Sequence, residues 1–397
     1  MTLRPGVHTV PTADRDGITA LMRGINGAFE KMGPVLPLGP GRKQPAALDG
    51  WSPFGPRGWL AALPSDAGAL VATSGSTGAP KLVVLSTDAL RASGEATHVR
   101  LGGAGRWLLA LPAHHIAGLQ VVARSVLAGT TPTLLPPGPF TGEAFTAAAT
   151  KMLAGDDRAY VSLVPTQLGR LIADDAARPV LARFSAVLIG GAALNPGLAQ
   201  QAADAGVNIV RTYGMSETSG GCVYDGVGLD GVQWRIEDDG RILLTGPMLA
   251  SGYLGDTELS AESFPEIDGT RWFRTSDFGR EVDGRLEVLG RIDDVIISGG
   301  VNIAPVPIEA ALGAHPEVSE AAVVGVPDPQ WGQAVIALAV GRFDEDELRE
   351  SVRQNLGGVG VPKRIFSVDE LPALESGKID RGAAQQMAAA LYGSHSK

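Results

Sequence analysis

The sequence has little cysteine and no long apolar run, and each shortage excludes a class of protein. Cys222 is the only cysteine among 397 residues, which excludes an intrachain disulfide framework and favours a reducing compartment, so we expect a cytoplasmic protein. No apolar run reaches the roughly 18 residues of a membrane helix, so no membrane span is predicted. The net charge of −10 argues against nucleic acid or an anionic membrane as the main partner.

The chain is longer than one ordinary single-core domain, and its pattern changes along its length. Between residues 70 and 213, short apolar runs alternate with helix-like stretches, which indicates a largely parallel sheet covered on both faces. From about residue 230 strands dominate, and a compact segment with its own strands and helices follows Gly290. We predict an α/β protein with a large, multi-layered domain of mostly parallel sheets at 1–292 and a small α+β domain at 293–397.

Local signals predict where three helices begin. Residues 17–31 show an amphipathic pattern. Asn195 followed by Pro196 is typical of a cap and a first-turn proline. Asp344 with Glu347 resembles a capping box at the start of the helix in the C-terminal segment.

A segment rich in hydroxyls and glycines ends in one of the few lysines of the chain. It reads Thr73, Ser74, Gly75, Ser76, Thr77, Gly78, Ala79, Pro80 and Lys81. Glycines let backbone N–H groups approach a phosphate, hydroxyls add donors, and the lysine supplies positive charge. Most such clusters are surface turns, so the loop alone does not establish phosphate binding. The P-loop of kinases and GTPases is excluded, because it has glycine directly before the lysine and Ser or Thr directly after it, where this chain has Pro80 and Leu82.

Six further segments follow the loop in an order that one family shares. They are His-His-Ile-Ala-Gly at 114–118, Gly-Gly-Ala-Ala-Leu at 190–194, Tyr-Gly-Met-Ser-Glu at 213–217, Trp-Phe-Arg-Thr-Ser-Asp at 272–277, Gly-Arg-Ile-Asp-Asp through Gly-Gly-Val-Asn-Ile at 290–303, and Ser-Gly-Lys-Ile-Asp-Arg at 376–381. With the loop, they make the chain similar to the adenylate-forming superfamily of acyl- and aryl-CoA synthetases, peptide-synthetase adenylation domains and luciferases. The resemblance covers residues 70 to about 385.

The resemblance implies an enzyme that uses ATP, Mg²⁺ and coenzyme A. A carboxylate first attacks the α-phosphate of ATP to give an acyl-adenylate and pyrophosphate, and the CoA thiolate then displaces AMP. The charge of the first step spreads over phosphate oxygens, so positioning and electrostatic stabilisation are expected to supply most of the catalysis.

The resemblance also assigns roles to residues at matching positions. Those expected to bind ATP are Thr73, Ser74, Gly75, Ser76, Thr77, Gly78, Lys81, Gly190, Gly191, Ala192, Tyr213, Gly214, Asp277 and Arg291. Those expected in catalysis are Lys81, His115, Ser216, Glu217 and Lys378, and those expected against the substrate are His115, Gly191 and Thr218. Glu217 is also expected to hold Mg²⁺, which takes oxygen ligands.

The small C-terminal domain is expected, from the same resemblance, to be mobile about a hinge at Asp293. Lys378 would act in the first half-reaction, and Gly299 and Gly300 would line the CoA channel in the second. The chain departs from the family at Ser276, where the family has glycine. It also has a shorter stretch before the glycine-rich loop, so we expect a trimmed N-terminal subdomain.

Within the family, the sequence is most similar to the short o-succinylbenzoate–CoA ligases of menaquinone synthesis. Another aryl- or short acyl-CoA ligase of the benzoate type and a stand-alone enzyme that loads a carrier protein are the alternatives. A non-catalytic nucleotide sensor on the same fold would have lost Lys81, Glu217 or Lys378, and all three are present.

The second carboxylate of such a substrate needs its own donors, and the motifs do not supply them. Thr166, Gln120 and Thr218 are candidates, with packing roles as the alternative for each. The expected partners are small molecules, and a homodimer is compatible with the sequence.

Overall fold

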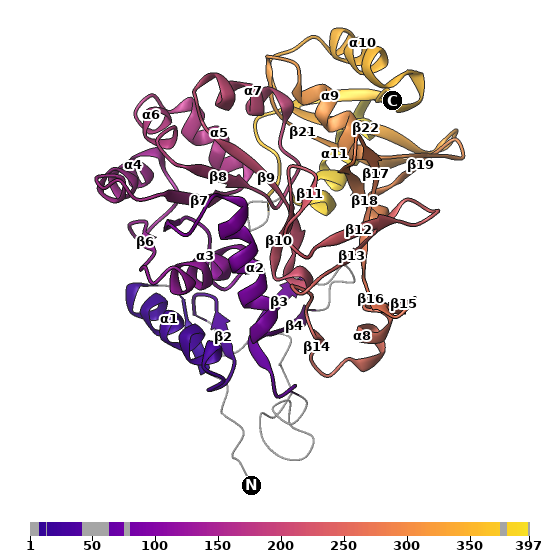
Figure 1. Cartoon of the computed structure of the whole chain (residues 1–397). Coiled ribbons are helices and arrows are strands. Elements are labelled where there is room, and N and C mark those ends of the chain that lie inside the picture. Colours follow the sequence, from indigo (N-terminus) through magenta and orange to yellow (C-terminus); the bar gives the residue numbers. More distant parts are fainter. Residues whose placement is uncertain (1–7, 13, 42–62, 75–79, 374–378, 396–397) are drawn as a thin grey trace.

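The computed structural model describes residues 8–12, 14–41, 63–74, 80–373 and 379–395. Gly75, Ser76, Thr77, Gly78 and Lys378 therefore lie outside the described residues. Figure 1 shows a large body, built from the chain up to β18, with a smaller C-terminal part at one end. None of the helices in the described ranges is long and apolar enough to cross a membrane.

A seven-stranded sheet forms the middle of the large body. Its order is β11-β10-β9-β8-β7-β5-β6, and pairing is parallel from β6 to β9 and antiparallel at β10 and β11. The strands are β5 (Arg106–Leu109), β6 (Thr133–Leu134), β7 (Ala159–Leu163), β8 (Ala186–Ile189), β9 (Ile209–Met215), β10 (Gly220–Tyr224) and β11 (Val227–Gly228). The parallel strands from β5 to β9 correspond to the parallel sheet that the sequence predicts.

Helices cover both faces of this sheet, which explains its continuous apolar strands. The helices α2 (Thr87–Arg100) and α3 (Ile116–Leu127) lie on one face, where Trp107, Tyr160 and Tyr224 are fully buried. The other face packs around Phe145 and Leu171 against α4 (Gly142–Met152), α5 (Pro165–Ala173), α6 (Ala177–Leu181) and α7 (Pro196–Asp204).

A five-stranded sheet of mixed direction carries the glycine-rich segment. Its order is β1-β2-β3-β4-β14, from β1 (His8–Pro11), β2 (Val35–Leu38), β3 (Ala67–Ser74), β4 (Pro80–Ser86) and β14 (Gly252–Tyr253). The strands β3 and β4 form an antiparallel hairpin. Helix α1 (Arg15–Phe29) begins two residues before the predicted 17–31, because the Asp14 carboxylate caps it by accepting a 2.8 Å hydrogen bond from Gly17 N.

The third sheet of the large body is antiparallel. Its order is β12-β13-β17-β18, from β12 (Gln233–Ile236), β13 (Arg241–Thr245), β17 (Phe273–Val282) and β18 (Arg285–Arg291). Asp283 and Gly284 both have positive φ at the β17–β18 turn, as a two-residue hairpin with an Asp-Gly pair requires. Beside this sheet lie α8 (Thr257–Ser263), β15 (Glu266–Ile267) and β16 (Thr270–Arg271), and the short turns η3 (Ser216–Thr218) and η4 (Ile292–Asp294) follow β9 and β18.

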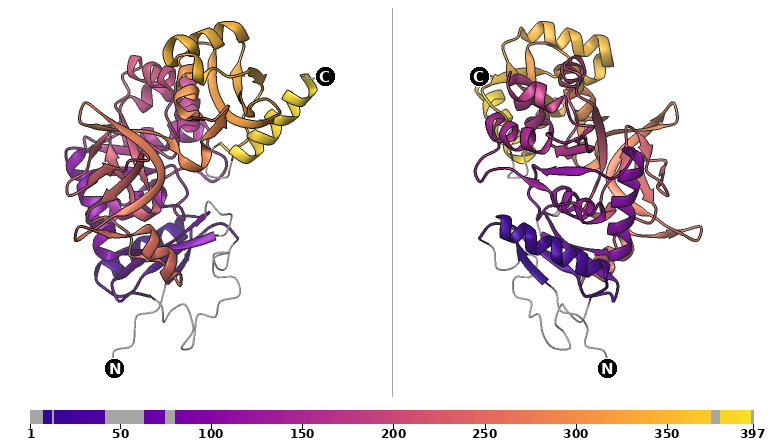
Figure 2. Two further views of the ribbon diagram at one scale, coloured as in Figure 1. Left: turned by 90° about the vertical axis from the view of Figure 1, so that its right-hand side faces the viewer. Right: turned by 60° about the vertical axis from the view of Figure 1, so that its left-hand side comes forward.

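The C-terminal part has one sheet with helices on both faces, and Figure 2 shows it at one end of the molecule. The strands are β19 (Ile296–Ser298), β20 (Val301–Ile303), β21 (Val318–Asp328), β22 (Gly332–Gly341) and β23 (Arg364–Val368). The helices α9 (Pro305–Gly313) and α10 (Glu345–Leu356) cover one face and α11 (Arg381–His395) the other, with η5 (Gly358–Gly360) after α10. In the described ranges, no hydrophobic cluster combines residues from both sides of Asp293.

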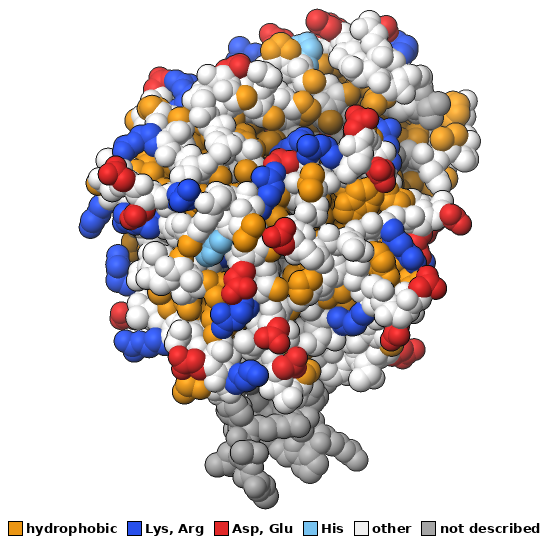
Figure 3. Space-filling view, viewed as in Figure 1, with side chains coloured by type: hydrophobic (Ala, Val, Ile, Leu, Met, Phe, Trp, Pro, Cys, Tyr) orange, Lys and Arg blue, Asp and Glu red, His pale blue; other side chains and the backbone are white. Residues whose placement is uncertain are grey.

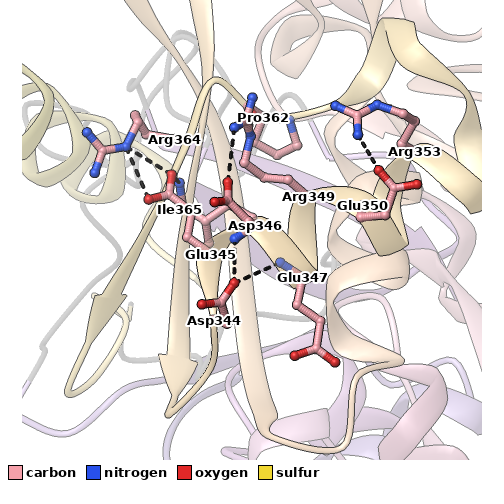
Figure 4. Close-up of polar contacts among 10 residues, drawn as sticks. All are labelled: Asp344, Glu345, Asp346, Glu347, Arg349, Glu350, Arg353, Pro362, Arg364 and Ile365. Atoms are coloured by element: carbon pink, nitrogen blue, oxygen red, sulfur yellow. Dashed lines mark hydrogen bonds and ion pairs between the residues drawn. The ribbon is translucent and has the colours of Figure 1, made fainter.

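The two predicted caps form, one of them only in part. Asn195 Oδ1 accepts hydrogen bonds from Gly197 N at 2.7 Å and Leu198 N at 3.2 Å. Asp344 Oδ1 accepts from the backbone N of Asp346 and Glu347 at 2.9 and 3.0 Å. Figure 4 shows the Glu347 carboxylate pointing away from Asp344, so the reciprocal half of the capping box is missing.

The neighbouring Glu345 ties α10 to the sheet instead. Its Oε1 accepts from Arg364 Nε at 2.9 Å and from Ile365 N at 3.0 Å (Figure 4). The first turn of α10, which Asp344 caps, is thereby also fixed to β23 by a tertiary contact that no local pattern indicates.

Candidate active site

The hairpin of β3 and β4 holds both ends of the glycine-rich loop. Thr73 pairs with Lys81 across the hairpin. The ammonium nitrogen of Lys81 lies 5.4 Å from the ring centroid of Tyr253. Tyr253 belongs to β14, which pairs with β4 so that Tyr253 stands opposite Val83. Sheet pairing therefore places the ring beside the lysine that follows the loop.

The turn after β9 brings Glu217 to the same place. Tyr253 Oη donates a 2.9 Å hydrogen bond to Glu217 Oε1. The Thr218 hydroxyl closes the turn by accepting from Met215 N at 2.9 Å, and it lies 2.8 Å from the carbonyl oxygen of Gly220. The Tyr253 hydroxyl thus joins two side chains that are 36 residues apart in sequence.

Burial and nearby charges act in opposite directions on Glu217. Burial raises the pKa of the Glu217 carboxyl, while the Tyr253 hydrogen bond and the positive charges of Lys81 and Arg291 oppose that rise. Within the described ranges Lys81 forms no ion pair with Glu217. The ammonium group contacts the ring of Tyr253 and the carboxylate contacts its hydroxyl, so the two charges are near each other without a direct contact. Such an arrangement suits a ligand that carries both negative charge and a bound metal ion.

A second group of predicted residues gathers near the end of β9, the middle of β17 and the end of β18. Tyr213 Oη donates a 2.7 Å hydrogen bond to Asp277 Oδ2. Asp277 stands opposite Arg291 in the β17–β18 register, and Arg291 donates to Asp293 Oδ2 at 2.9 Å. Burial raises the pKa of Tyr213 well above its ordinary value, so the phenol stays neutral and keeps donating to Asp277.

The loop of Gly190, Gly191 and Ala192 follows the carboxyl end of β8, next to the strand that carries Tyr213. A Cβ on Gly190 would lie 2.4 Å from Thr212 Oγ1, and Gly191 has φ +84°. A Cβ on Gly214 would lie 2.1 Å from the carbonyl oxygen of Gly220. These glycines allow backbone to pass close to backbone at the sheet edge where α/β proteins bind ligands.

His115 lies at the start of α3, with its ring centroid 4.2 Å from that of His114. One turn further along α3, Gln120 Nε2 donates a 2.6 Å hydrogen bond to the carbonyl oxygen of Ser219. The beginning of α3 therefore packs on the turn that contains Ser216 and Glu217. Ser216 is 7% exposed, and no described residue hydrogen-bonds its hydroxyl.

The candidates for a distal carboxylate are placed differently. Thr218 is fully buried with its hydroxyl committed to the turn, and the Gln120 amide nitrogen is committed to Ser219. Thr166 lies in the first turn of α5. Both Gln120 and Thr218 stabilise the turn, and contact of any of the three with substrate stays a prediction.

Some predicted residues belong to the C-terminal part and not to these groups. Gly299 and Gly300 form the exposed β19–β20 turn with φ +58° and +80°, and Gly299 N donates to Trp331 O at 2.9 Å. Lys378 lies outside the described residues. The segment that contains it is closed at its base by a bridge between Ala373 and Ile379.

Arg381 anchors the chain just beyond that segment. Its Nε lies 3.1 Å from Asp294 Oδ2, and a terminal guanidinium nitrogen lies 2.9 Å from Glu309 Oε1. The start of α11 is thus tied to the residue that follows Asp293.

The residue of this site that sequence reasoning missed is Tyr253, which contacts both Lys81 and Glu217. It is one of only five tyrosines, and it belongs to a two-residue strand with no periodic pattern. The scarcity of tyrosine is the sequence signal that could have drawn attention to it.

Comparisons with known proteins agree with this geometry. Residues 60–254 match the family model of the AMP-binding enzyme, and residues 307–378 match the model of the AMP-binding enzyme C-terminal domain. The probable 2-succinylbenzoate–CoA ligase of Mycobacterium tuberculosis is 45% identical over 329 residues, which cover 81% of this chain and 84% of that protein. The 2-succinylbenzoate–CoA ligase of Listeria monocytogenes is 35% identical over 341 residues, which cover 81% and 70%.

A solved structure extends the likeness to three dimensions. The O-succinylbenzoate coenzyme A synthetase of Bacillus subtilis in complex with AMP superposes with a TM-score of 0.67 at 28% identity, covering 80% of this chain and 68% of that one. The predicted fold class is confirmed by this likeness and by the sheet order described above. The chain belongs to the AMP-binding enzyme family.

Proposed function

We propose that this protein is an ATP-dependent, AMP-forming ligase that joins 2-succinylbenzoate to coenzyme A. The observation that carries the proposal is the pairing of Lys81 and Glu217 on one tyrosine without an ion pair between them. The names of the relatives from Mycobacterium tuberculosis and Listeria monocytogenes support the choice of acid and thiol.

The reaction has two steps, both displacements. An oxygen of the substrate carboxylate bonds to the α-phosphorus of ATP, and the bond from that phosphorus to the bridging oxygen breaks, so pyrophosphate leaves with the electron pair. The CoA thiolate then bonds to the acyl carbon, and AMP leaves with the electrons of the acyl–oxygen bond. The thiol proton passes to solvent.

The first group of residues fits the leaving pyrophosphate. We assign Lys81 and Thr73, together with the loop beyond them, to the β- and γ-phosphates. The Glu217 carboxylate fits Mg²⁺, because it is buried, accepts one hydrogen bond at Oε1 and forms no ion pair with a described residue. When bound, Mg²⁺ supplies positive charge to the phosphate oxygens and needs few protein carboxylates. Ser216 is assigned to the α-phosphate.

The second group fits the nucleoside. Asp277, held by Tyr213, is assigned to the ribose hydroxyls together with Arg291. The hydrogen bond fixes the Tyr213 ring, and we assign its face to the adenine opposite Gly190–Ala192. His115 and Gly191 are assigned to the side of the acid substrate.

The separate cores support a domain boundary at Asp293, with an adenylation domain at 1–292 and a mobile domain at 293–397. The two parts also contact each other beside Asn195, the residue that caps α7. Asn195 Nδ2 lies 3.5 Å from Ser319 O, and a Cβ on Gly313 would lie 2.3 Å from the same nitrogen. We assign Asp293 as the hinge, Lys378 to the first half-reaction, and Gly299 and Gly300 to the CoA channel in the second.

Two alternatives share the first step and differ in the acid or the acceptor. A benzoate-type ligase would take a different acid, and a carrier-loading enzyme would take a protein-bound thiol.

We place the protein in the cytoplasm, where ATP and coenzyme A are used together. A homodimer stays a prediction that analytical ultracentrifugation tests.

The test is a pyrophosphate-release screen over carboxylic acids with purified protein, with and without CoA. We expect 2-succinylbenzoate to give the highest rate, and AMP and the CoA thioester to appear in equal amounts when CoA is present. Faster turnover of benzoate or fatty acids would replace the proposed substrate. Pyrophosphate release with no thioester product would favour the carrier-loading alternative.

A further inference from the structure

We propose that Tyr253 is a positioning residue for the ATP-dependent step, which keeps Glu217 and Lys81 apart and correctly oriented for a metal-bound polyphosphate. The inference rests on the proposed function, because it takes Glu217 as the metal ligand and Lys81 as the phosphate-binding cation. It goes beyond that function by assigning a role to a residue outside the seven motifs.

The backbone around Tyr253 is fixed on both sides of the strand. Leu254 N donates to Leu82 O, and Ser251 N donates to Val84 O, each at 2.8 Å. Tyr253 N itself donates to Ser260 Oγ at 2.9 Å. The ring therefore has a set position relative to β4, which carries Lys81.

The hydroxyl fixes the Glu217 carboxylate. It donates to Oε1 at 2.9 Å, while the backbone oxygen of Glu217 accepts from Ala250 N at 2.8 Å. Glu217 is thus bound at its main chain and its side chain by one segment, 250–253. A carboxylate held by one oxygen presents the other in a fixed direction, and such outer partners of a metal ligand tune metal affinity.

The ring supports the Lys81 ammonium. Its centroid lies 5.4 Å from Nζ, within the range of a cation–π interaction. Two phenylalanine rings support the Tyr253 ring. The ring centroid of Phe264 lies 6.0 Å from that of Tyr253 and 5.0 Å from that of Phe273. The ammonium is attracted to the ring face while the hydroxyl takes the carboxylate, so one side chain separates the two opposite charges.

A second cluster of the same residue types provides a matched control. In the C-terminal part, Lys363 Nζ lies 5.5 Å from the ring centroid of Tyr392, and Tyr392 Oη donates to Asp328 Oδ2 at 2.7 Å. There Lys363 also reaches the same oxygen at 2.9 Å. Tyr392 packs against a C-terminal core that contains none of the proposed nucleotide residues, so Tyr392→Phe removes an equivalent hydrogen bond outside the site.

The experiment compares Tyr253→Phe with Tyr392→Phe in the full-length enzyme. The measurements are the Mg²⁺ concentration for half-maximal pyrophosphate release, the affinity for a non-hydrolysable ATP analogue with and without Mg²⁺ by calorimetry, and the melting temperature without ligand. We expect Tyr253→Phe to raise the Mg²⁺ requirement about tenfold or more and to leave metal-free nucleotide affinity unchanged. Tyr392→Phe should leave both unchanged. An unchanged Mg²⁺ requirement in Tyr253→Phe, or an equal shift in both variants, would overturn the proposal.

Two further variants test whether Tyr253 acts through its proposed partners. In a Glu217→Gln background, adding Tyr253→Phe should produce no further loss of Mg²⁺-dependent nucleotide binding, because coupled residues are not additive. Tyr253→Leu removes the ring as well and should weaken nucleotide binding even without Mg²⁺. Additive losses in the double variant would contradict the inference. The calorimetry needs no acid substrate, so an error in the proposed substrate would leave this test intact.

Discussion

The two lysine–tyrosine–carboxylate clusters use the same chemistry with opposite outcomes. In the C-terminal cluster, Lys363 and Tyr392 converge on one oxygen of Asp328, whose side chain is 3% exposed. Those hydrogen bonds hold the pKa of Asp328 well below its usual range. In the large domain, Tyr253 stands between Lys81 and Glu217, and burial raises the pKa of Glu217.

We propose that this difference distinguishes a cluster that stabilises the fold from one that binds a charged ligand. A closed ion pair satisfies its charges within the chain, as a structural role requires. An open one leaves a buried acid and a nearby cation unsatisfied, which costs folding free energy and is retained where a ligand supplies the missing charges. Charged side chains of both signs are interspersed over the face in Figure 3. Ion pairs between such exposed groups contribute little to the free energy of unfolding.

The largest expected effect comes from exchanging the two carboxylates for amides. Glu217→Gln should lower the rate of acyl-adenylate formation by about 100-fold or more, because charge stabilisation of the phosphoryl transition state is lost. Asp328→Asn should leave that rate unchanged and lower the melting temperature. Pyrophosphate release and thermal melting, measured on both variants, check this. Equal effects of the two variants on catalysis would erase the distinction between the clusters.

The two lysines give the next effect. Lys81→Met should weaken ATP binding and turnover about 10- to 100-fold, as expected for one charge-assisted contact. Its melting temperature should stay close to that of the wild type, because Lys81 has no ion-pair partner in the described part of the chain. Lys363→Met should leave ATP binding and turnover unchanged and lower the melting temperature, because Asp328 then loses its ion-pair partner. Steady-state kinetics against ATP and calorimetric melting distinguish the two, and a large loss of stability in Lys81→Met would count against an open cluster.

The smallest effect is a pH dependence of opposite sign for the two clusters. Asp328 has a lowered pKa in the folded state, so its contribution to the free energy of unfolding is present above the unfolded pKa of about 3.9 and is lost as the pH falls through the folded value. Glu217 has a raised pKa, so its contribution is present at low pH and is lost as the pH rises through the folded value. Denaturant unfolding without nucleotide or metal, from pH 3 to 8, compares wild type with Asp328→Asn and Glu217→Gln. Differences that run in the same direction with pH would refute the contrast.

Sequence patterns predicted the elements whose signals are local. The helix α1 and the caps at Asn195 and Asp344 follow from residues that are close to one another in sequence. The ordered motifs predicted the family, which the comparisons confirm. The domain boundary at Asp293 and the individual roles of the site residues stay predictions.

Contacts between distant segments could not be predicted in this way. Tyr253 meets Glu217 across 36 residues, and Tyr213 meets Asp277 across 64. Both depend on how separate sheets assemble, and the strand that carries Tyr253 has only two residues. The missing half of the capping box also involves a distant segment, because Glu347 Oε1 lies 3.8 Å from His315 Nε2.

The anchoring of Arg381 has a mechanical consequence for Lys378. The segment that contains Lys378 is closed at its base by Ala373 and Ile379, and Arg381 ties the chain just beyond it to Asp294 and Glu309. A rotation at Asp293 would therefore move that base along an arc as part of a rigid body. Ala373, Ile379 and Arg381 would then keep their positions relative to Asp294 and Glu309, so the proposed role of Lys378 in the first half-reaction would depend on the orientation of the whole C-terminal part.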